Sequence, residues 1–300
     1  MGYNSRMKTI LILLLGAVML KPVFSQTDTL FAGGSICSSG EWQLVFADEF
    51  NGNELDRNNW YTWYPYTIDG SDQCEFCRAH GEGGQIFVDS NVTVTNGILK
   101  LSARRQEVEW YNEKRGYSSG MVHSRHQFGM GRYEICCKLP YGMGFWPAFW
   151  IYGNEASEID VFEIGCQRPR RHHMGIITDR KHSTFDKRKC YLKNFSKDFH
   201  IFAMEWDANF VRFFVDNKEV WKVSLLQPKC GKIMRRCNPQ KGKYKLQPAF
   251  PQAGEKFNII ANLTIGTDKT PFTKAPDQRT VLPNQMEIDW IRVYERGVNK

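Results

Sequence analysis

Short stretches in which apolar and polar residues alternate run through most of the chain. The stretch at 91–105 (NVTVTNGILKLSARR) alternates on both sides of Asn96-Gly97, a dipeptide that favours a tight hairpin turn. A second alternating pair, at 210–223, is interrupted by Asp216-Asn217. Period-two alternation is typical of β-strands with one buried face. Further runs of this kind lie at 131–140, 199–206, 256–266 and 286–296.

The whole chain favours one all-β domain. No stretch keeps the 3.6-residue period of an amphipathic helix. The chain has 300 residues, of which 42% are hydrophobic and 14% aromatic, so it can bury one large core. Many strands separated by turns indicate a β-sandwich. We expect this domain over 41–297, preceded at 26–40 by an irregular lead-in rich in Gly, Ser and Thr.

The chain begins with the features of a secretory signal peptide. Arg6 and Lys8 precede an apolar run from Ile10 to Leu20, and small residues follow, with cleavage expected near Ser25. We therefore assign residues 1–25 to a signal peptide. The apolar run is short for a membrane span, and no second apolar span follows it. The sequence predicts a secreted protein, periplasmic or extracellular, without a membrane span, and we expect a monomer.

The nine cysteines favour disulfides, because exported proteins meet an oxidising environment. Their odd number leaves at least one unpaired. Cys74-x-x-Cys77 could be half of a zinc site or a redox pair, but the chain offers no second pair at similar spacing. Structural disulfides are the preferred interpretation. The adjacent Cys136 and Cys137 would face opposite sides of a strand, so we do not expect them to pair with each other.

The formal net charge is +8, and basic loops carry much of it. One of them, at 168–173 (RPRRHH), contains Arg168, Arg170 and Arg171. A solvated surface loop is the ordinary interpretation. The alternative is recognition of sulfate or carboxylate groups on a polysaccharide, for which the planar fork of arginine is suited. No nucleic-acid motif accompanies this charge, so the sequence predicts no nucleic-acid partner.

Three carboxylates, those of Glu158, Asp160 and Glu163, lie in the short apolar run 157–165 (SEIDVFEIG). Regular alternation would place the first two on one face and Glu163 on the other. Exposed strands carry charges routinely, but like charges this close repel each other. A β-bulge at Val161-Phe162 would return Glu163 to the shared face. Such a cluster suits retaining glycoside hydrolysis, which needs one ionised nucleophile and one protonated acid.

The motif E-I-D-x-x-E, following G-F-W-P-A-F-W at 144–150, resembles glycoside hydrolase family 16, in the branch that carries the bulge. This is the laminarinase, agarase and carrageenase group. The resemblance implies a jelly-roll, concanavalin A-like sandwich with a concave substrate cleft and no cofactor for catalysis. It implies that Glu158 is the nucleophile, Glu163 the acid/base and Asp160 the residue that positions the nucleophile. The resemblance extends over 46–60, 131–153, 199–217 and 286–296.

Two tryptophans and one histidine are candidate substrate-binding residues. Trp146 and Trp150 could fill the core or stack on sugar rings. Pro147 favours a cleft rim, and hence the sugar platform, for Trp146, while both roles of Trp150 stay open. By the resemblance, His173 corresponds to the first His of an H-x-x-x-H pattern found in many β-1,3-glucanases, and Ile177 stands at the second. His173 could equally be structural.

A structural calcium away from the cleft is common in the family that the chain resembles. Glu49, Asp289 and the carbonyl of Gly97 stand where its ligands would be, and oxygen donors suit Ca²⁺. The other interpretation is that the two acids are ordinary strand-end residues.

We therefore expect a secreted, endo-acting, retaining β-glycoside hydrolase whose partner is a polysaccharide. The expected substrate is a β-1,3- or mixed-linked glucan or a β-galactan. One alternative is a sulfated-galactan hydrolase of the carrageenan or porphyran type. Another is a transglycosylase with the same residues. The third, a non-catalytic carbohydrate-binding lectin on the same fold, would be expected to lack one of the three carboxylates.

Overall fold

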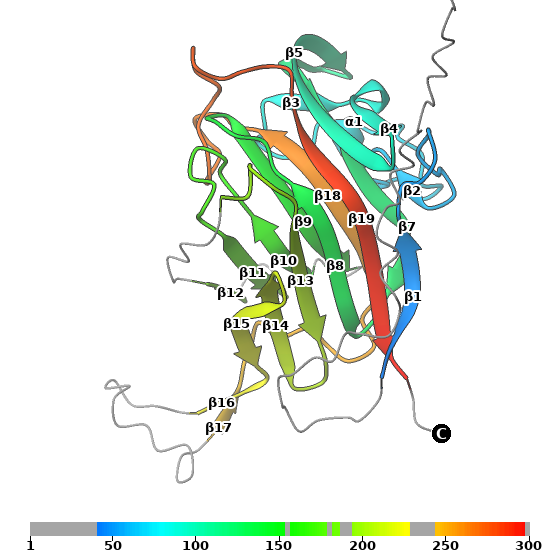
Figure 1. The fold of residues 1–300 in the computed structure, drawn as a ribbon, viewed down its shortest axis with the longest axis vertical. Coiled ribbons are helices and arrows are strands. Elements are labelled where there is room, and N and C mark those ends of the chain that lie inside the picture. Colours follow the sequence, from blue (N-terminus) through cyan, green and yellow to red (C-terminus); the bar gives the residue numbers. More distant parts are fainter. Residues whose placement is uncertain (1–40, 154–156, 179–181, 187–193, 229–243, 298–300) are drawn as a thin grey trace, which may run out of the picture. The chain divides into compact units, whose positions relative to one another are not determined.

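The computed structural model describes residues 41–153, 157–178, 182–186, 194–228 and 244–297, which belong to one compact unit, Gly40–Lys300. The predicted signal peptide and lead-in lie outside the described residues. Within them, the predicted all-β sandwich is confirmed: two large sheets, antiparallel except for one parallel pair of strands, pack face to face (Figure 1).

The larger sheet has ten strands within the described residues and lies in front in Figure 1. The strand β1 (Trp42–Asp48) pairs with β19, and β4 (Val92–Thr95) pairs with β5. The remaining order is β15 (Lys218–Ser224), β14 (Phe210–Val215), β13 (His200–Trp206), β8 (Gly131–Lys138), β19 (Asn284–Arg296), β5 (Ile98–Trp110), β6 (Glu113–Ser119) and β3 (Gln85–Phe87).

The smaller sheet has seven strands and carries the candidate carboxylates. Its order is β12 (Ser183–Phe185), β11 (His173–Ile177), β10 (Glu158–Glu163), β9 (Phe145–Gly153), β18 (Phe257–Ile265), β7 (Met121–Phe128) and β2 (Trp60–Tyr61). The short elements are β16 (Leu226–Pro228), β17 (Tyr244–Leu246), the helix α1 (Glu75–Arg78) and the 3₁₀ turn η1 (Asp89–Asn91). Among the described residues, no helix has the length and apolar character needed to cross a membrane.

Both predicted hairpin turns are present. Asn96 and Gly97 have φ of 54° and 72° between β4 and β5, and Asp216 and Asn217 have φ of 48° and 63° between β14 and β15. Positive φ at both central residues is the geometry that matches the twist of paired strands, and Asn, Asp and Gly adopt it most easily. The local sequence therefore sets the register of these two hairpins.

One apolar core lies between the two sheets. Alternation in β4 buries Val92 and Val94 and exposes the threonines between them, as the period-two pattern predicts. Across the sandwich, the ring of Phe162 in β10 lies 4.4 Å from that of Phe202 in β13. The strand β10 is thus anchored to the opposite sheet by an aromatic contact in the core.

One of the expected disulfides is present within the described residues. Cys74 and Cys77 form a disulfide at the start of α1. Within the described residues Cys136, Cys137 and Cys166 are free and buried, so the adjacent pair is not bridged, as predicted. The other four cysteines lie outside the described residues.

Candidate active site

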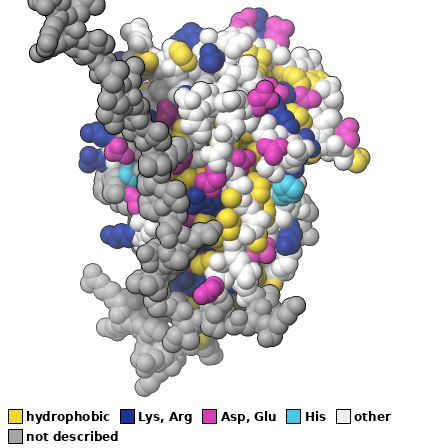
Figure 2. Space-filling view, turned by 45° about the vertical axis from the view of Figure 1, so that its right-hand side comes forward, with side chains coloured by type: hydrophobic (Ala, Val, Ile, Leu, Met, Phe, Trp, Pro, Cys, Tyr) yellow, Lys and Arg dark blue, Asp and Glu magenta, His cyan; other side chains and the backbone are white. Residues whose placement is uncertain are grey.

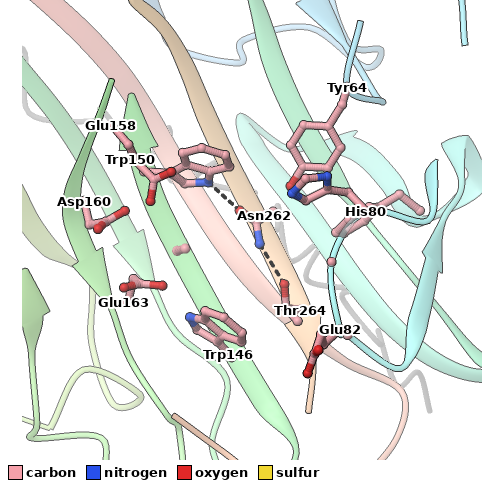
Figure 3. A pocket seen from close by; sticks show the side chains of 14 residues that line it. Tyr64, His80, Glu82, Trp146, Trp150, Glu158, Asp160, Glu163, Asn262 and Thr264 are labelled. Atoms are coloured by element: carbon pink, nitrogen blue, oxygen red, sulfur yellow. Dashed lines mark hydrogen bonds between the residues drawn. The ribbon is translucent and has the colours of Figure 1, made fainter. Parts of the chain in front are cut away.

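The register of β10 brings the three carboxylates to one face of the sheet. Asp160 pairs with Trp150 of β9, the register then shifts, and Glu163 pairs with Ala148. Residues 148 and 150 are two apart and share a face, so Glu163 shares the face of Asp160 and Glu158. The predicted bulge is therefore present, and the three side chains point into the same space (Figure 3).

Burial and one hydrogen bond hold the bulge in place. Val161 and Phe162 are consecutive yet both buried, so the extra residue is accommodated on the core side. His172 donates a hydrogen bond from Nε2 to the carbonyl of Val161 at 3.0 Å. Burial lowers the pKa of His172 to about 4, so the ring is neutral at physiological pH. The sequence analysis singled out the neighbouring His173 and missed this residue.

Gly175 leaves space for the side chain of Asp160. It is the cross-strand partner of Asp160 on β11. A Cβ atom at Gly175 would lie 2.5 Å from Oδ2 of Asp160 and 2.8 Å from the ring of Phe185. Both distances are shorter than van der Waals contact, so any larger residue would displace the carboxylate or the ring. The absence of a side chain at this position therefore lets Asp160 lean over β11.

The floor of the cleft is formed by side chains of β9 and β18. The indole Nε1 of Trp150 donates to Oδ1 of Asn262 at 2.8 Å, and Nδ2 of Asn262 donates to Oγ1 of Thr264 at 3.0 Å (Figure 3). These bonds fix the plane of the Trp150 ring. Trp146 packs against Phe272 with ring centroids 5.1 Å apart, and its buried indole N–H faces Glu163 (Figure 3).

A cavity of about 210 Å³ lies above this floor. Trp146 and Trp150 line it, so both belong to the cleft and not to the core between the sheets. The opposite wall comes from the segment 62–87, which follows β2 and includes β3. The sequence analysis identified none of the wall residues, which follow no periodic pattern. They are Tyr64, His80, Gly81, Glu82, Gly83 and Phe87.

Aromatic rings make part of the wall rigid. The ring of Tyr64 stacks on that of Tyr66 with centroids 5.5 Å apart, and it lies 6.2 Å from the ring of Trp150 on the floor. The hydroxyl of Tyr66 and Nδ1 of His80 are hydrogen-bonded at 3.1 Å. Wall and floor therefore meet through ring contacts of the kind that also bind sugar rings.

Burial and mutual repulsion set the protonation of the three carboxylates. Burial, and next the charge of Glu158, raise the pKa of Glu163 to about 8, so this residue is protonated at neutral pH. Burial, followed by the charges of Glu163 and Glu158, also raises the pKa of Asp160 well above its usual value. Burial raises the pKa of Glu158, but a hydrogen bond from Asp160 opposes this rise and favours its ionised form.

His173 lies beside the cavity without lining it. It pairs with Glu163 across β10 and β11, and its ring lies 4.6 Å from that of Phe272. Phe272 in turn contacts Trp146, so the three rings form one edge of the cleft. Burial, and next the charge of Arg171, lower the pKa of His173 to about 4.

The three predicted sulfate-binding arginines follow β10 and do not line the cavity. Arg168 and Arg170 are exposed, and Arg171 is half-buried. Arg168 and Arg171 lie close enough to His173 for their charges to lower its pKa. A role in binding sulfate stays a prediction for these residues.

The candidate calcium ligands lie away from the cleft. Both carboxylate oxygens of Glu49 accept hydrogen bonds from Arg292, at 2.7 and 2.9 Å. On β19, Asp289 follows Ile288, which pairs with Leu99 just after the Gly97 turn. Figure 2 shows acidic and basic side chains interspersed on one face of the molecule. The calcium site stays a prediction, and binding through Glu49 would require its ion pair with Arg292 to open.

Comparison with known proteins gives one family. The model of glycosyl hydrolases family 16 matches residues 83–291. A glucan endo-1,3-beta-glucosidase A1 of Niallia circulans is 28% identical over 84% of this chain and 38% of its own length. A glucan endo-1,3-beta-glucosidase of Cryptopygus antarcticus is 28% identical over 85% of this chain and 93% of its own length.

A solved structure shares the fold. The laminarinase catalytic domain from Thermotoga maritima MSB8 superposes with a TM-score of 0.67 at 26% identity, covering 86% of this chain and 100% of that one. The predicted jelly-roll sandwich is thereby confirmed. The family model spans more than half of the chain, and the bulged strand carries the expected carboxylates. The protein is a glycosidase that belongs to glycoside hydrolase family 16.

Proposed function

We propose that this protein is an endo-acting, retaining β-glycoside hydrolase that cleaves a β-1,3- or mixed-linked glucan. The observation that carries the proposal is the bulge in β10, which brings the buried carboxyl group of Asp160 and the half-buried ones of Glu158 and Glu163 beside two tryptophans in one cavity. The relatives named as glucan endo-1,3-beta-glucosidases support the choice of substrate. The chain spans 38% of the length of the first of these relatives. The activity in that relative's name is therefore a proposal for this chain.

In the first step, a carboxylate oxygen of Glu158 attacks the anomeric carbon. The bond between that carbon and the glycosidic oxygen breaks, and Glu163 gives its proton to this oxygen. The products are a free sugar hydroxyl and a glycosyl ester on Glu158. The protonated Asp160 holds Glu158 by a hydrogen bond and favours its ionised form before the attack.

In the second step, the roles reverse. Esterification removes the charge of Glu158, which is one cause of the raised pKa of Glu163. The pKa of Glu163 therefore falls, and its carboxylate takes a proton from water while the water oxygen attacks the anomeric carbon. The ester bond breaks and Glu158 returns as a carboxylate. A sugar hydroxyl in place of water would give transglycosylation from the same intermediate.

The remaining parts of the proposal concern binding and location. We propose that Trp146 and Trp150 stack on sugar rings, that His173 contributes to the edge of the cleft, and that catalysis needs no cofactor. The apolar leader supports secretion, and we propose that the secreted protein acts on its polysaccharide as a monomer.

A polysaccharide panel tests the function. The purified protein is incubated with laminarin, lichenan, agarose and κ-carrageenan, and the products are separated by chromatography. We expect oligosaccharides of several lengths from laminarin or lichenan, which is the pattern of internal cleavage. Products that are longer than the substrate chains would indicate transglycosylation. Binding without any cleavage would favour the lectin alternative and contradict the proposal.

A β-galactan, sulfated or not, is the second candidate substrate. The observation that favours it is Ile177, which pairs with Glu158 across β10 and β11 and places an apolar side chain where the β-1,3-glucanase pattern has a histidine. Cleavage of agarose or κ-carrageenan, with laminarin untouched, would establish this candidate in the same panel.

A further inference from the structure

The loop 79–85 is the part of the wall that follows α1 and ends at the first residue of β3. His80 and Glu82 on this loop line the cavity, as do the glycines on either side of Glu82. Figure 3 places Glu82 on the Trp146 side of the cleft, below Thr264. The loop contains no long regular element, so other contacts must hold its shape.

Arg115 of β6 holds the inner side of this loop. Its Nη1 donates to the carbonyls of Gly83 at 2.7 Å and Gln85 at 3.1 Å, and its Nη2 donates to those of Ala79 at 3.0 Å and Gly81 at 3.4 Å. Four alternate carbonyls therefore converge on one guanidinium. Only arginine offers enough donors in one plane for this arrangement.

The outer part of the loop is bound to β18, the strand that contributes to the cleft floor. The backbone N–H of Gly84 donates to the carbonyl of Ile265 at 2.8 Å, and the N–H of Ile265 donates to Oε1 of Gln85 at 2.7 Å. Oγ1 of Thr267 donates to the carbonyl of Glu82 at 2.9 Å. These bonds give the wall a fixed position relative to the floor.

The charge that the loop presents to the cavity is negative. Among the described residues that line the cavity, the charged side chains other than histidine are all acidic, and no lysine or arginine is present. Arg115 lies near, but its Nη donors are directed to backbone carbonyls and its Nε donates to Glu113. The acidic lining residues are Glu82, Glu158, Asp160 and Glu163. Glu82 is exposed and has no part in the proposed chemistry.

We propose that loop 79–85, positioned by Arg115, determines specificity by presenting the carboxylate of Glu82 to sugar hydroxyls and repelling sulfated sugar units. The inference rests on the proposed function and narrows its substrate to an uncharged polysaccharide. A carboxylate accepts hydrogen bonds from hydroxyl groups, and a cleft of one charge sign opposes ligands of the same sign. Rejection of the wrong ligand by like charge is a common source of selectivity.

The first test is Glu82→Gln, a surface substitution that preserves size. Laminarin is the substrate, and chemically sulfated laminarin is the competitive inhibitor. We expect Ki for the sulfated polymer to fall by about three- to tenfold as repulsion is lost, with a smaller difference at high salt. KM for laminarin should rise by about two- to fivefold, because the charged acceptor becomes neutral. The control Glu54→Gln removes an exposed acid outside the cleft and should change neither constant.

The second test is Arg115→Lys, which keeps the charge but cannot reach four carbonyls. We expect KM for laminarin to rise by about five- to tenfold with kcat within about twofold, the pattern of lost uniform binding. Selectivity against sulfated laminarin should fall as it does in Glu82→Gln. The control Arg105→Lys changes an exposed arginine of β5 and should have no effect. Lower thermal stability with unchanged KM and selectivity would make Arg115 merely structural and contradict the inference.

The outcomes separate this inference from the proposed function. Wild-type cleavage of laminarin with an unchanged Ki in Glu82→Gln would overturn the inference alone. Wild-type preference for sulfated over neutral polymer would overturn both. If neither polymer is cleaved, the proposed function fails, and calorimetric binding of laminarin and sulfated laminarin to wild type and Glu82→Gln still tests the role of Glu82. Equal affinities of the two proteins for the sulfated polymer would then reject it.

Discussion

The floor and the wall of the cleft are built by different means. The floor consists of three adjacent strands, β10, β9 and β18, whose alternate side chains line the cavity. The wall is the segment 62–87, which has one four-residue helix and the short strand β3. Pairing of backbones positions the floor, whereas arginine side chains, one disulfide and a few hydrogen bonds to β18 position the wall.

A second arginine shows the same principle in the wall. Arg78 is buried, donates to the carbonyl of Phe87 at 3.2 Å and forms an ion pair with Asp72 at 2.8 Å. Its guanidinium lies over the rings of Trp63, at 5.2 Å, and Trp110, at 5.4 Å. The difference between the regions suggests that changes in the floor alter chemistry, while changes in the wall alter binding and selectivity.

The largest effect is expected in the floor, from Glu158→Gln. The substitution removes the nucleophile and leaves its volume, so kcat should fall by about 10⁴-fold or more with the fold intact. Turnover of the polysaccharide and the circular dichroism spectrum are the measurements. A kcat within about tenfold of wild type would remove Glu158 from the mechanism.

Glu163→Ala should lower kcat on the natural polymer by about 10²- to 10⁴-fold and affect activated aryl glycosides far less. The pH dependence of wild-type activity should show the ionisation of Glu163. The pKa of Glu163 is raised to about 8, so its acid form is present below that pH and lost above it. Activity of the wild type should therefore fall above pH 8. The variant should not show this fall when it is assayed on aryl glycosides. Equal losses on both substrate classes would indicate a structural role.

Gly175→Ala should lower kcat by about 10- to 100-fold, because the added Cβ displaces the carboxylate of Asp160 from its place beside Glu158. The matched control is Gly116→Ala in β6, where a Cβ atom would meet nothing within 4 Å. Kinetics on the polymer and thermal melting are compared for the two variants. Equal kcat in both would show that Asp160 tolerates displacement.

His172→Phe should destabilise the bulge, because it leaves the carbonyl of Val161 buried without a donor. The expected loss is about 1–3 kcal/mol in the free energy of unfolding, together with a kcat lowered by about three- to tenfold. His172→Gln keeps a donor and should recover part of both losses. If the phenylalanine variant loses stability but keeps full kcat, the bulge does not depend on this bond for its alignment.

The smallest effect is expected in the wall, from the double variant Cys74→Ser and Cys77→Ser. The disulfide closes a short loop, so the stability loss should be no more than about 2 kcal/mol. KM should rise by about two- to threefold with kcat unchanged, since the floor is untouched. A loss of kcat comparable to that of Gly175→Ala would mean that the wall also positions the catalytic groups.

The sequence predicted the floor well because its information is periodic. Alternation and turn dipeptides indicated the strands, and the spacing of Glu158, Asp160 and Glu163 required a bulge that the register confirms. Asn262 and Thr264 could also have been found, since they are polar at alternate positions of an apolar strand. The sequence could not show which of His172 and His173 contacts the bulge, because this depends on which ring is buried.

The wall could not be predicted from the sequence for a physical reason. Its shape depends on hydrogen bonds from Arg115 to carbonyls at least 30 residues away. Every residue has a backbone carbonyl, so the residue types in the loop do not indicate that Arg115 binds it. The sequence likewise left several partners possible for Cys74, and the structure shows that it pairs with Cys77.

Trapping of the covalent intermediate tests the central claim most directly. The wild-type enzyme is treated with a 2-deoxy-2-fluoro glycosyl fluoride built on the disaccharide of the polymer that it cleaves, and is then digested for peptide mass spectrometry. The fluorine slows the second step, so the ester should accumulate. The account predicts one sugar adduct, on Glu158, and none in Glu158→Gln. An adduct on Asp160 or Glu163, or inactivation without any ester, would contradict it.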